Sequence, residues 1–76
     1  MSNLPTLGYK DLARIFENLG YRHIRTKGDH LIYEKPGLHR PIVIPKYKDI
    51  PKFIVKNNIR TAGITEAEFL KMLYNS

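Results

Sequence analysis

The segment that decides the fold is residues 21–45, which read YRHIRTKGDHLIYEKPGLHRPIVIP. Glycine-containing pairs, Gly28-Asp29 and Pro36-Gly37, divide it where tight turns are expected. The runs between these turns are rich in β-branched and aromatic residues, which favour strands. Because the connections are short, an antiparallel meander is the simplest topology. We therefore predict three strands, at residues 21–27, 30–35 and 40–45.

A helical pattern precedes this segment. Apolar residues recur at i, i+3, i+4 and i+7, which is the stripe of an amphipathic helix: Leu12, Ile15, Phe16 and Leu19. Gly8 stands where an N-cap is tolerated, and Gly20 stands where a terminating glycine is expected. The pattern predicts a first helix over residues 8–19.

Two further helices are predicted after the strands. Pro51 is acceptable in a first helical turn, and Gly63 ends the helix that follows it. The apolar stripe of this helix is Val55, Ile59 and Ala62. Thr65 and Glu68 then form a capping-box pattern that opens a short last helix. That helix is expected to bury Phe69, Met72 and Leu73.

The order of these elements predicts an α+β fold, α-β-β-β-α with a short C-terminal helix. Two helices would cover one face of a three-stranded antiparallel sheet and leave the other face open. Pro41 and Pro45 cannot donate to a ladder, which places them at a sheet edge or at strand ends. With 76 residues we expect one domain, 1–76, with a thin core that a tight partner could stabilise further.

The charge is positive and unevenly distributed. Thirteen Lys and Arg against seven Asp and Glu give a formal net charge of +6. Ten basic and three acidic residues lie between Gly20 and Arg60, so this block alone carries +7. Such a block suits a polyanion, most commonly RNA or DNA, and the alternative is a well-solvated surface.

Other classes receive no support from the composition. There is no cysteine, so disulfides and thiolate metal sites are excluded, and this fits a reducing compartment. No stretch approaches the roughly 20 apolar residues needed to span a bilayer, and the N-terminal residues lack the pattern of a signal peptide. We expect a soluble cytoplasmic protein that does not bind a membrane.

Several local motifs, in this order and spacing, resemble the HicA toxin family. That family typically reads G-[FY], then R-x-x-G-S-H-x-x-[YF], a strand ending in V-P, and A-G-[IL]-[ST]-x-x-[DE]-F. The matching segments here are Gly20-Tyr21, Arg25–Tyr33, Val43-Ile44-Pro45 and Ala62–Phe69. The resemblance runs from Leu4 to about Phe69 and implies a fold like that of the double-stranded-RNA-binding domain.

The chain departs from the family pattern at three places. The serine before the histidine is Asp29 here, and a histidine often found beyond the V-P strand is Tyr47. The G-T-L-R start of the second long helix is replaced by residues 53–56, which keep only an aliphatic and a basic residue.

The resemblance implies a toxin of a type II toxin–antitoxin pair with a HicB-like antitoxin partner. Its activity would be that of a metal-independent endoribonuclease, an mRNA interferase that uses no cofactor, and it would block translation. His30 is the implied catalytic residue, and histidine suits proton transfer near neutral pH. The cations that we expect to bind RNA phosphates are Arg25, Lys27, Lys46 and Lys56.

Asp29 is expected to tune His30, because a carboxylate favours the protonated imidazole but repels a phosphate. We predict weaker cleavage without loss of RNA binding. A non-catalytic RNA-binding module and a purely protein-binding domain remain as alternatives. We expect His23 and His39 to be surface or strand residues, and Tyr21 and Tyr33 to belong to the core.

Overall fold

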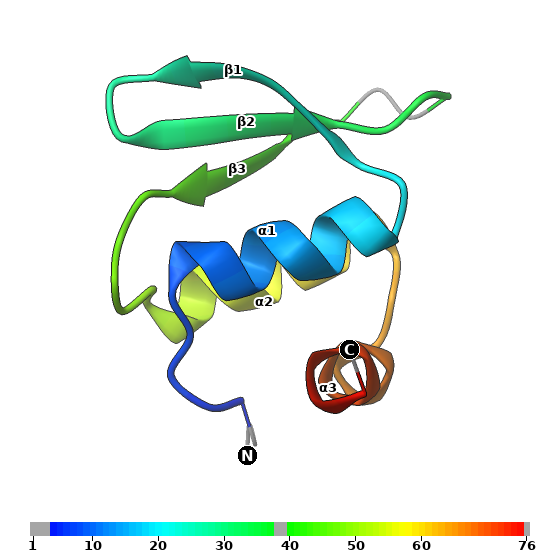
Figure 1. Cartoon of the computed structure of the whole chain (residues 1–76). Coiled ribbons are helices and arrows are strands. Elements are labelled where there is room, and N and C mark those ends of the chain that lie inside the picture. Colours follow the sequence, from blue (N-terminus) through cyan, green and yellow to red (C-terminus); the bar gives the residue numbers. More distant parts are fainter. Residues whose placement is uncertain (1–3, 38–39, 76) are drawn as a thin grey trace.

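The computed structural model of the chain describes residues 4–37 and 40–75. It has the predicted α+β architecture, in the order α-β-β-β-α-α (Figure 1). The elements are α1 (Tyr9–Asn18), β1 (Arg22–Lys27), β2 (His30–Glu34), β3 (Ile42–Pro45), α2 (Lys52–Ala62) and α3 (Glu66–Tyr74). None of the helices described here combines the length and the apolar character needed to cross a membrane.

The sheet is the predicted antiparallel meander, with strand order β1-β2-β3. Its strands are shorter than predicted at three ends. Tyr21 precedes β1, Lys35 follows β2, and β3 begins only after Pro41, whose missing N–H keeps it out of the ladder. Pro45 is the last residue of β3, which is an edge strand. Of the predicted surface histidines, His39 lies outside the described residues.

The predicted helix caps are confirmed. Gly8 caps α1, and its backbone N–H donates to the Asp11 carboxylate at 3.2 Å. A side chain at Gly8 would come within 2.9 Å of the Lys48 carbonyl oxygen, so this close approach requires glycine. Gly63 ends α2 with a φ of 74°, which L-residues rarely adopt. Pro51 is one position earlier than predicted, at the N-cap of α2.

The last helix begins with the predicted capping box. The Glu68 backbone N–H donates to the Thr65 hydroxyl oxygen at 3.0 Å, and the Thr65 N–H donates to the Glu68 carboxylate at 2.9 Å. Phe69 is fully buried, whereas Met72 and Leu73 are only partly buried against the core. This helix packs on α1 and α2 and forms a third layer below them (Figure 1).

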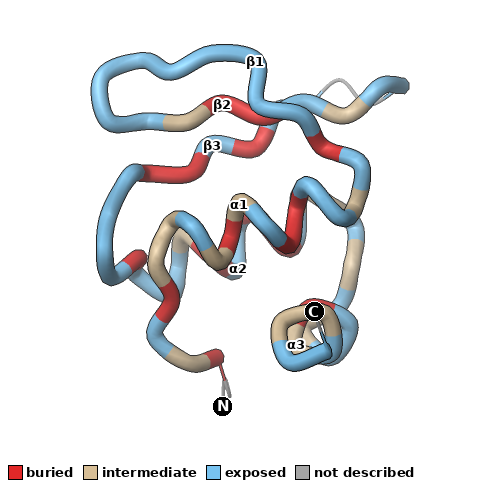
Figure 2. Tube along the Cα trace, in the orientation of Figure 1, coloured by how far each residue is buried: buried red, intermediate tan, exposed pale blue. Residues whose placement is uncertain are grey.

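The core lies between the sheet and the helices. Both α1 and α2 pack against β3, on the same side of the sheet (Figure 1). Buried side chains accordingly belong to β2, β3, the helices and the segments that flank them, and every residue of β1 is exposed (Figure 2). The core cluster consists of Leu4, Leu7, Leu12, Ile15, Phe16, Tyr21, Tyr33, Ile42, Ile44, Ile50, Val55, Ile59 and Phe69.

Candidate active site

His30 is the first residue of β2, directly after a two-residue hairpin turn. Gly28, the first turn residue, has a φ of +61°, and Asp29, the second, does not have a positive φ. That combination is the pattern of a type II′ turn, which places glycine at the first central position. The turn sets Lys27 directly opposite His30 in the ladder.

Strand pairing places three basic or titratable side chains on one face of the sheet, and a register shift separates His23 from them. Regular alternation would put His23, Arg25 and Lys27 on the same face of β1. The register shifts between His23 and Arg25, so His23 pairs with Tyr33 and Arg25 pairs with Ile32. Because Ile32 and His30 are two residues apart, they share a face. Arg25, Lys27 and His30 therefore lie on one face, which we call the open face.

Tyr33 lies on the opposite face and anchors β2 to α1. It is 4% exposed, and its hydroxyl donates to the Glu17 carboxylate at 3.2 Å. Burial, followed by the charge of Glu17 and the hydrogen bond to it, raises the pKa of Tyr33 to about 12. The ring of His23 lies 5.4 Å from that of Tyr33, and His23 Nε2 is 2.8 Å from the Thr26 hydroxyl. Tyr33 is thus a core residue, as predicted, and His23 has local partners away from His30.

The turn brings the Asp29 carboxylate to the imidazole of His30. His30 Nδ1 lies 3.4 Å from Asp29 Oδ1, and both side chains are at least half exposed. Consecutive strand residues normally point to opposite faces, so this contact depends on Asp29 being in the turn and not in the strand. With the carboxylate at Nδ1, Nε2 is the ring nitrogen that remains for another group.

Of the four cations predicted to bind RNA, three lie around His30 and one does not. Arg25 and Lys27 are on the open face. The Lys46 backbone N–H donates to the Asp29 carbonyl oxygen at 2.6 Å, which places Lys46 beside the turn. Lys56 is exposed on α2 but follows Ile54 by two residues, about 200° around the helix. It therefore lies on a different side of α2 from the pocket described next.

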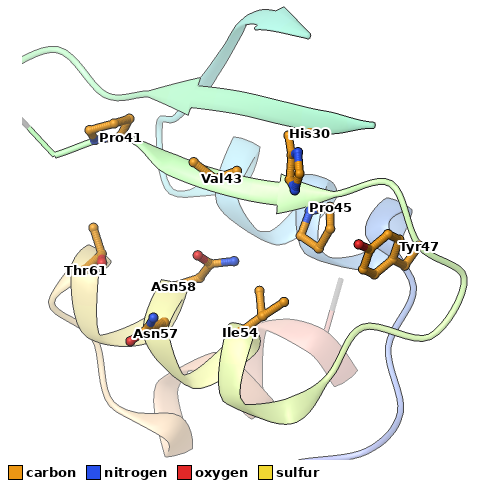
Figure 3. Close-up of a pocket in the computed structure, with 9 residues that line it drawn as sticks. All are labelled: His30, Pro41, Val43, Pro45, Tyr47, Ile54, Asn57, Asn58 and Thr61. Carbon is orange, nitrogen blue, oxygen red and sulfur yellow. The ribbon is translucent and has the colours of Figure 1, made fainter. Parts of the chain in front are cut away.

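A pocket of 330 Å³ adjoins His30 at the β3 edge of the sheet (Figure 3). We call it the β3–α2 pocket. One wall comes from the sheet and the segment after it, and the other from one side of α2, as Figure 3 shows. The lining residues are His30, Pro41, Val43, Pro45, Tyr47, Ile54, Asn57, Asn58 and Thr61.

Asn58 and Tyr47 are residues of this pocket that the sequence did not predict. Asn58 is 6% exposed, and its amide nitrogen has no hydrogen-bond partner among the described residues. An unpaired buried donor costs about 1–3 kcal/mol. The sequence held a signal for it, because Asn58 occupies the i+3 position in the stripe that Val55 starts and Ile59 continues.

The sequence model for HicA toxins of bacterial toxin–antitoxin systems matches residues 9–64, well over half of the 76-residue chain. The chain belongs to the HicA toxin family. The comparison with curated proteins gives no match. Membership in the family supports the role of a toxin that has an antitoxin partner.

Two of the motifs that resemble the HicA family meet at His30. The strand that ends in Val43-Ile44-Pro45 pairs with β2 so that Pro45 lies opposite His30. The Ala62–Phe69 motif, by contrast, is structural, since Gly63 ends α2 and Thr65 caps α3. Within the described part of this HicA-family chain, no group of three or more His, Asp or Glu side chains is arranged to hold a metal ion.

Proposed function

We propose that this HicA-family toxin is an endoribonuclease that cleaves mRNA beside His30 and so blocks translation. The observation that carries the proposal is the position of the imidazole. His30 is half exposed, lies directly opposite Lys27 on the open face, and lines the β3–α2 pocket. A titratable side chain between a cation and a pocket suits proton transfer to a bound anion.

The chemistry needs two proton transfers and a cation. The 2′-oxygen of the ribose attacks the adjacent phosphorus, the P–O5′ bond breaks, and a cyclic phosphate and a free 5′-hydroxyl result. Nε2 of His30 carries one of the two protons, either from the 2′-hydroxyl or to the departing 5′-oxygen, and solvent carries the other. Lys27 and Arg25 offset the extra negative charge of the phosphorane.

RNA binding follows from the same cations. Arg25, Lys27 and Lys46 would hold the backbone around the cut, and Lys56 would contact a phosphate further along, on another side of α2. Because phosphate contacts release counterions, the affinity for RNA should fall steeply as salt is raised. A HicB-like antitoxin would inhibit this activity in the cytoplasm by covering the His30 region.

The test compares two histidines of one strand pair. We expect wild-type protein to arrest growth and to cut purified RNA in the presence of a chelator. His30→Ala should lower the cleavage rate by roughly 10²–10⁴-fold, the usual contribution of a general acid or base. His23→Ala is the matched control, because His23 is also exposed but pairs with Thr26. Full activity in His30→Ala would refute the proposal.

A second candidate function is a non-catalytic RNA-binding module with the same open face. The contact of Asp29 with His30 favours it, because this carboxylate repels a phosphate that approaches the imidazole. The two functions differ in their prediction for purified protein. RNA that is bound in a salt-dependent manner but stays intact over long incubation would support the module and exclude the enzyme.

A further inference from the structure

Asn58 is a polar residue in an otherwise apolar helix face. Its neighbours in the stripe, Val55 and Ile59, are buried in the core. Asn58 is buried as well, yet its amide nitrogen has no hydrogen-bond partner in the part of the chain that the structure describes. An apolar residue of similar size would avoid this defect. Local rules of this kind are broken mainly at functional sites, where a ligand completes the interaction.

The amide of Asn58 projects from α2 toward β3, in the middle of the residues that line the β3–α2 pocket (Figure 3). Figure 3 shows its nitrogen on the side that faces Pro45 and Ile54. The last side-chain torsion of asparagine is broad, so the amide can turn toward a group that enters. The amide therefore offers N–H donors to the pocket in which His30 also takes part.

The remaining walls suit a flat, partly apolar ring. Pro45 and Ile54 provide apolar surface, and the ring of Tyr47, which is 41% exposed, lies at one end of the pocket (Figure 3). The volume of 330 Å³ is at the lower end of the range for ligand pockets. Unpaired bases of RNA are typically stacked on aromatic side chains and hydrogen-bonded at their edges.

We propose that the β3–α2 pocket is a nucleobase subsite. It receives one unpaired base next to the phosphodiester at His30, and the Asn58 amide donates to a carbonyl or ring-nitrogen acceptor of that base. The subsite rests on the proposed RNA-cleaving function and adds to it the substrate class, which is single-stranded RNA with a preferred base beside the cut. A base seated between Tyr47 and Ile54 would hold its own phosphate at the imidazole.

The first experiment measures binding without cleavage. The ¹⁵N-labelled full chain is titrated with the 3′-monophosphates of uridine, cytidine, adenosine and guanosine. We expect the side-chain amide signals of Asn58 to shift with at least one of them, and those of Asn18, on α1, to stay in place. The Asn58→Leu variant identifies the signals by their loss.

The second experiment measures base preference. Cleavage of a mixed pool of oligoribonucleotides gives the preferred base next to the cut. Asn58→Leu should reduce that preference roughly tenfold, as expected for one lost hydrogen bond. It should also melt at or above the wild-type temperature, because it removes an unpaired buried donor. Asn18→Leu, the same change on an exposed site outside the pocket, should keep the preference.

The outcomes separate the subsite from the enzyme. If no RNA is cut but the Asn58 signals shift with a nucleotide, the subsite stands and the proposed cleavage falls. If RNA is cut and Asn58→Leu keeps the full base preference, the subsite is wrong. Asn58 signals that stay fixed with all four nucleotides also overturn it. The occupant of the pocket would then be a side chain of a protein partner.

Discussion

The two faces of the sheet formed by β2 and β3 differ in how far their side chains are buried. On the covered face, Tyr33 and Ile44 are buried against the helices. On the open face, His30 is half exposed and Val43 is 39% exposed. The covered face therefore contributes most of the free energy of folding. On the open face Ile32 is buried as well, but the exposed residues His30 and Val43 can vary with little effect on stability. A small domain can in this way place reactive and cationic groups on a strand that the core already fixes.

The sharpest test of this comparison uses two adjacent residues of β3. Ile44→Ala on the covered face should lower the free energy of unfolding by about 2–5 kcal/mol. Since a domain of this size gains only about 3–5 kcal/mol from its core, the variant should lose a large part of its stability. Val43→Ala on the open face should lower it by about 0.5 kcal/mol or less. Urea denaturation followed by circular dichroism measures both, and equal losses would contradict the difference between the faces.

The next prediction concerns Tyr33 and alkaline pH. Its pKa is raised in the folded protein from 10.0 to about 12, so the stability it contributes is fully present below pH 10 and is lost as the pH rises toward 12. Tyr33→Phe should be about 1 kcal/mol less stable at pH 7, because the hydrogen bond to Glu17 is gone. It should show a flatter decline above pH 10.

Glu17→Gln is the control for the alkaline prediction. It keeps an acceptor for the Tyr33 hydroxyl but removes the negative charge that contributes to the raised pKa. The decline above pH 10 should therefore become smaller without disappearing, because burial is the larger cause. Melting temperatures across pH 8–11.5 would give all three curves, and identical curves for wild type and Tyr33→Phe would show that Tyr33 ionises without effect on folding.

A smaller loss of stability is expected from a substitution at the N-cap of α3, the helix that packs on α1 and α2. Thr65→Ala removes the N-cap of this helix and should cost about 1 kcal/mol. The Thr65 backbone N–H and, second, its side chain lower the pKa of Glu68 below the usual 4.5. Glu68 thus stabilises the fold above that pH and ceases to do so as the pH falls. Thermal melts at pH 7 and pH 3 should show a smaller difference in Thr65→Ala than in the wild type.

The elements with local signals could be predicted from the sequence alone. Gly8, Gly63 and the Thr65–Glu68 capping box mark helix ends through their own backbone geometry, and all three predictions are confirmed. The hairpin turn before His30 is equally local. Such features depend on neighbouring residues only, so no knowledge of the packing is needed.

The structural features that could not be predicted from the sequence depend on how the elements pack together. The exposure of Ile24 in β1, 46%, follows from where α1 and α2 lie, which this residue does not encode. The register shift after His23 separates it from Arg25, although strict alternation predicts the same face for both. Lys56 was grouped with the other cations by charge, but the phase of α2 turns it away from the pocket. Asn58 could have been found as a polar interruption of a buried stripe.

The last prediction concerns Asp29, where the open face departs from the family motif. Asp29→Ser should change the free energy of unfolding by less than about 0.5 kcal/mol, because its contact with His30 is half exposed. RNA affinity should rise by roughly twofold to tenfold at low salt, since a negative charge beside the phosphate site is removed. The gain should shrink as salt is added. Filter binding at two ionic strengths, with Asp49→Ser as the control, measures it.

If Asp29→Ser leaves both the RNA affinity and the cleavage rate unchanged, the carboxylate at Nδ1 neither repels the substrate nor orients His30. A rise in affinity together with a fall in cleavage rate would instead separate its two effects. The carboxylate would then hinder binding of the phosphate and still help the imidazole to present Nε2. A change in RNA affinity or in cleavage rate, with the free energy of unfolding unchanged, would show that Asp29 acts on the open face and not on the fold.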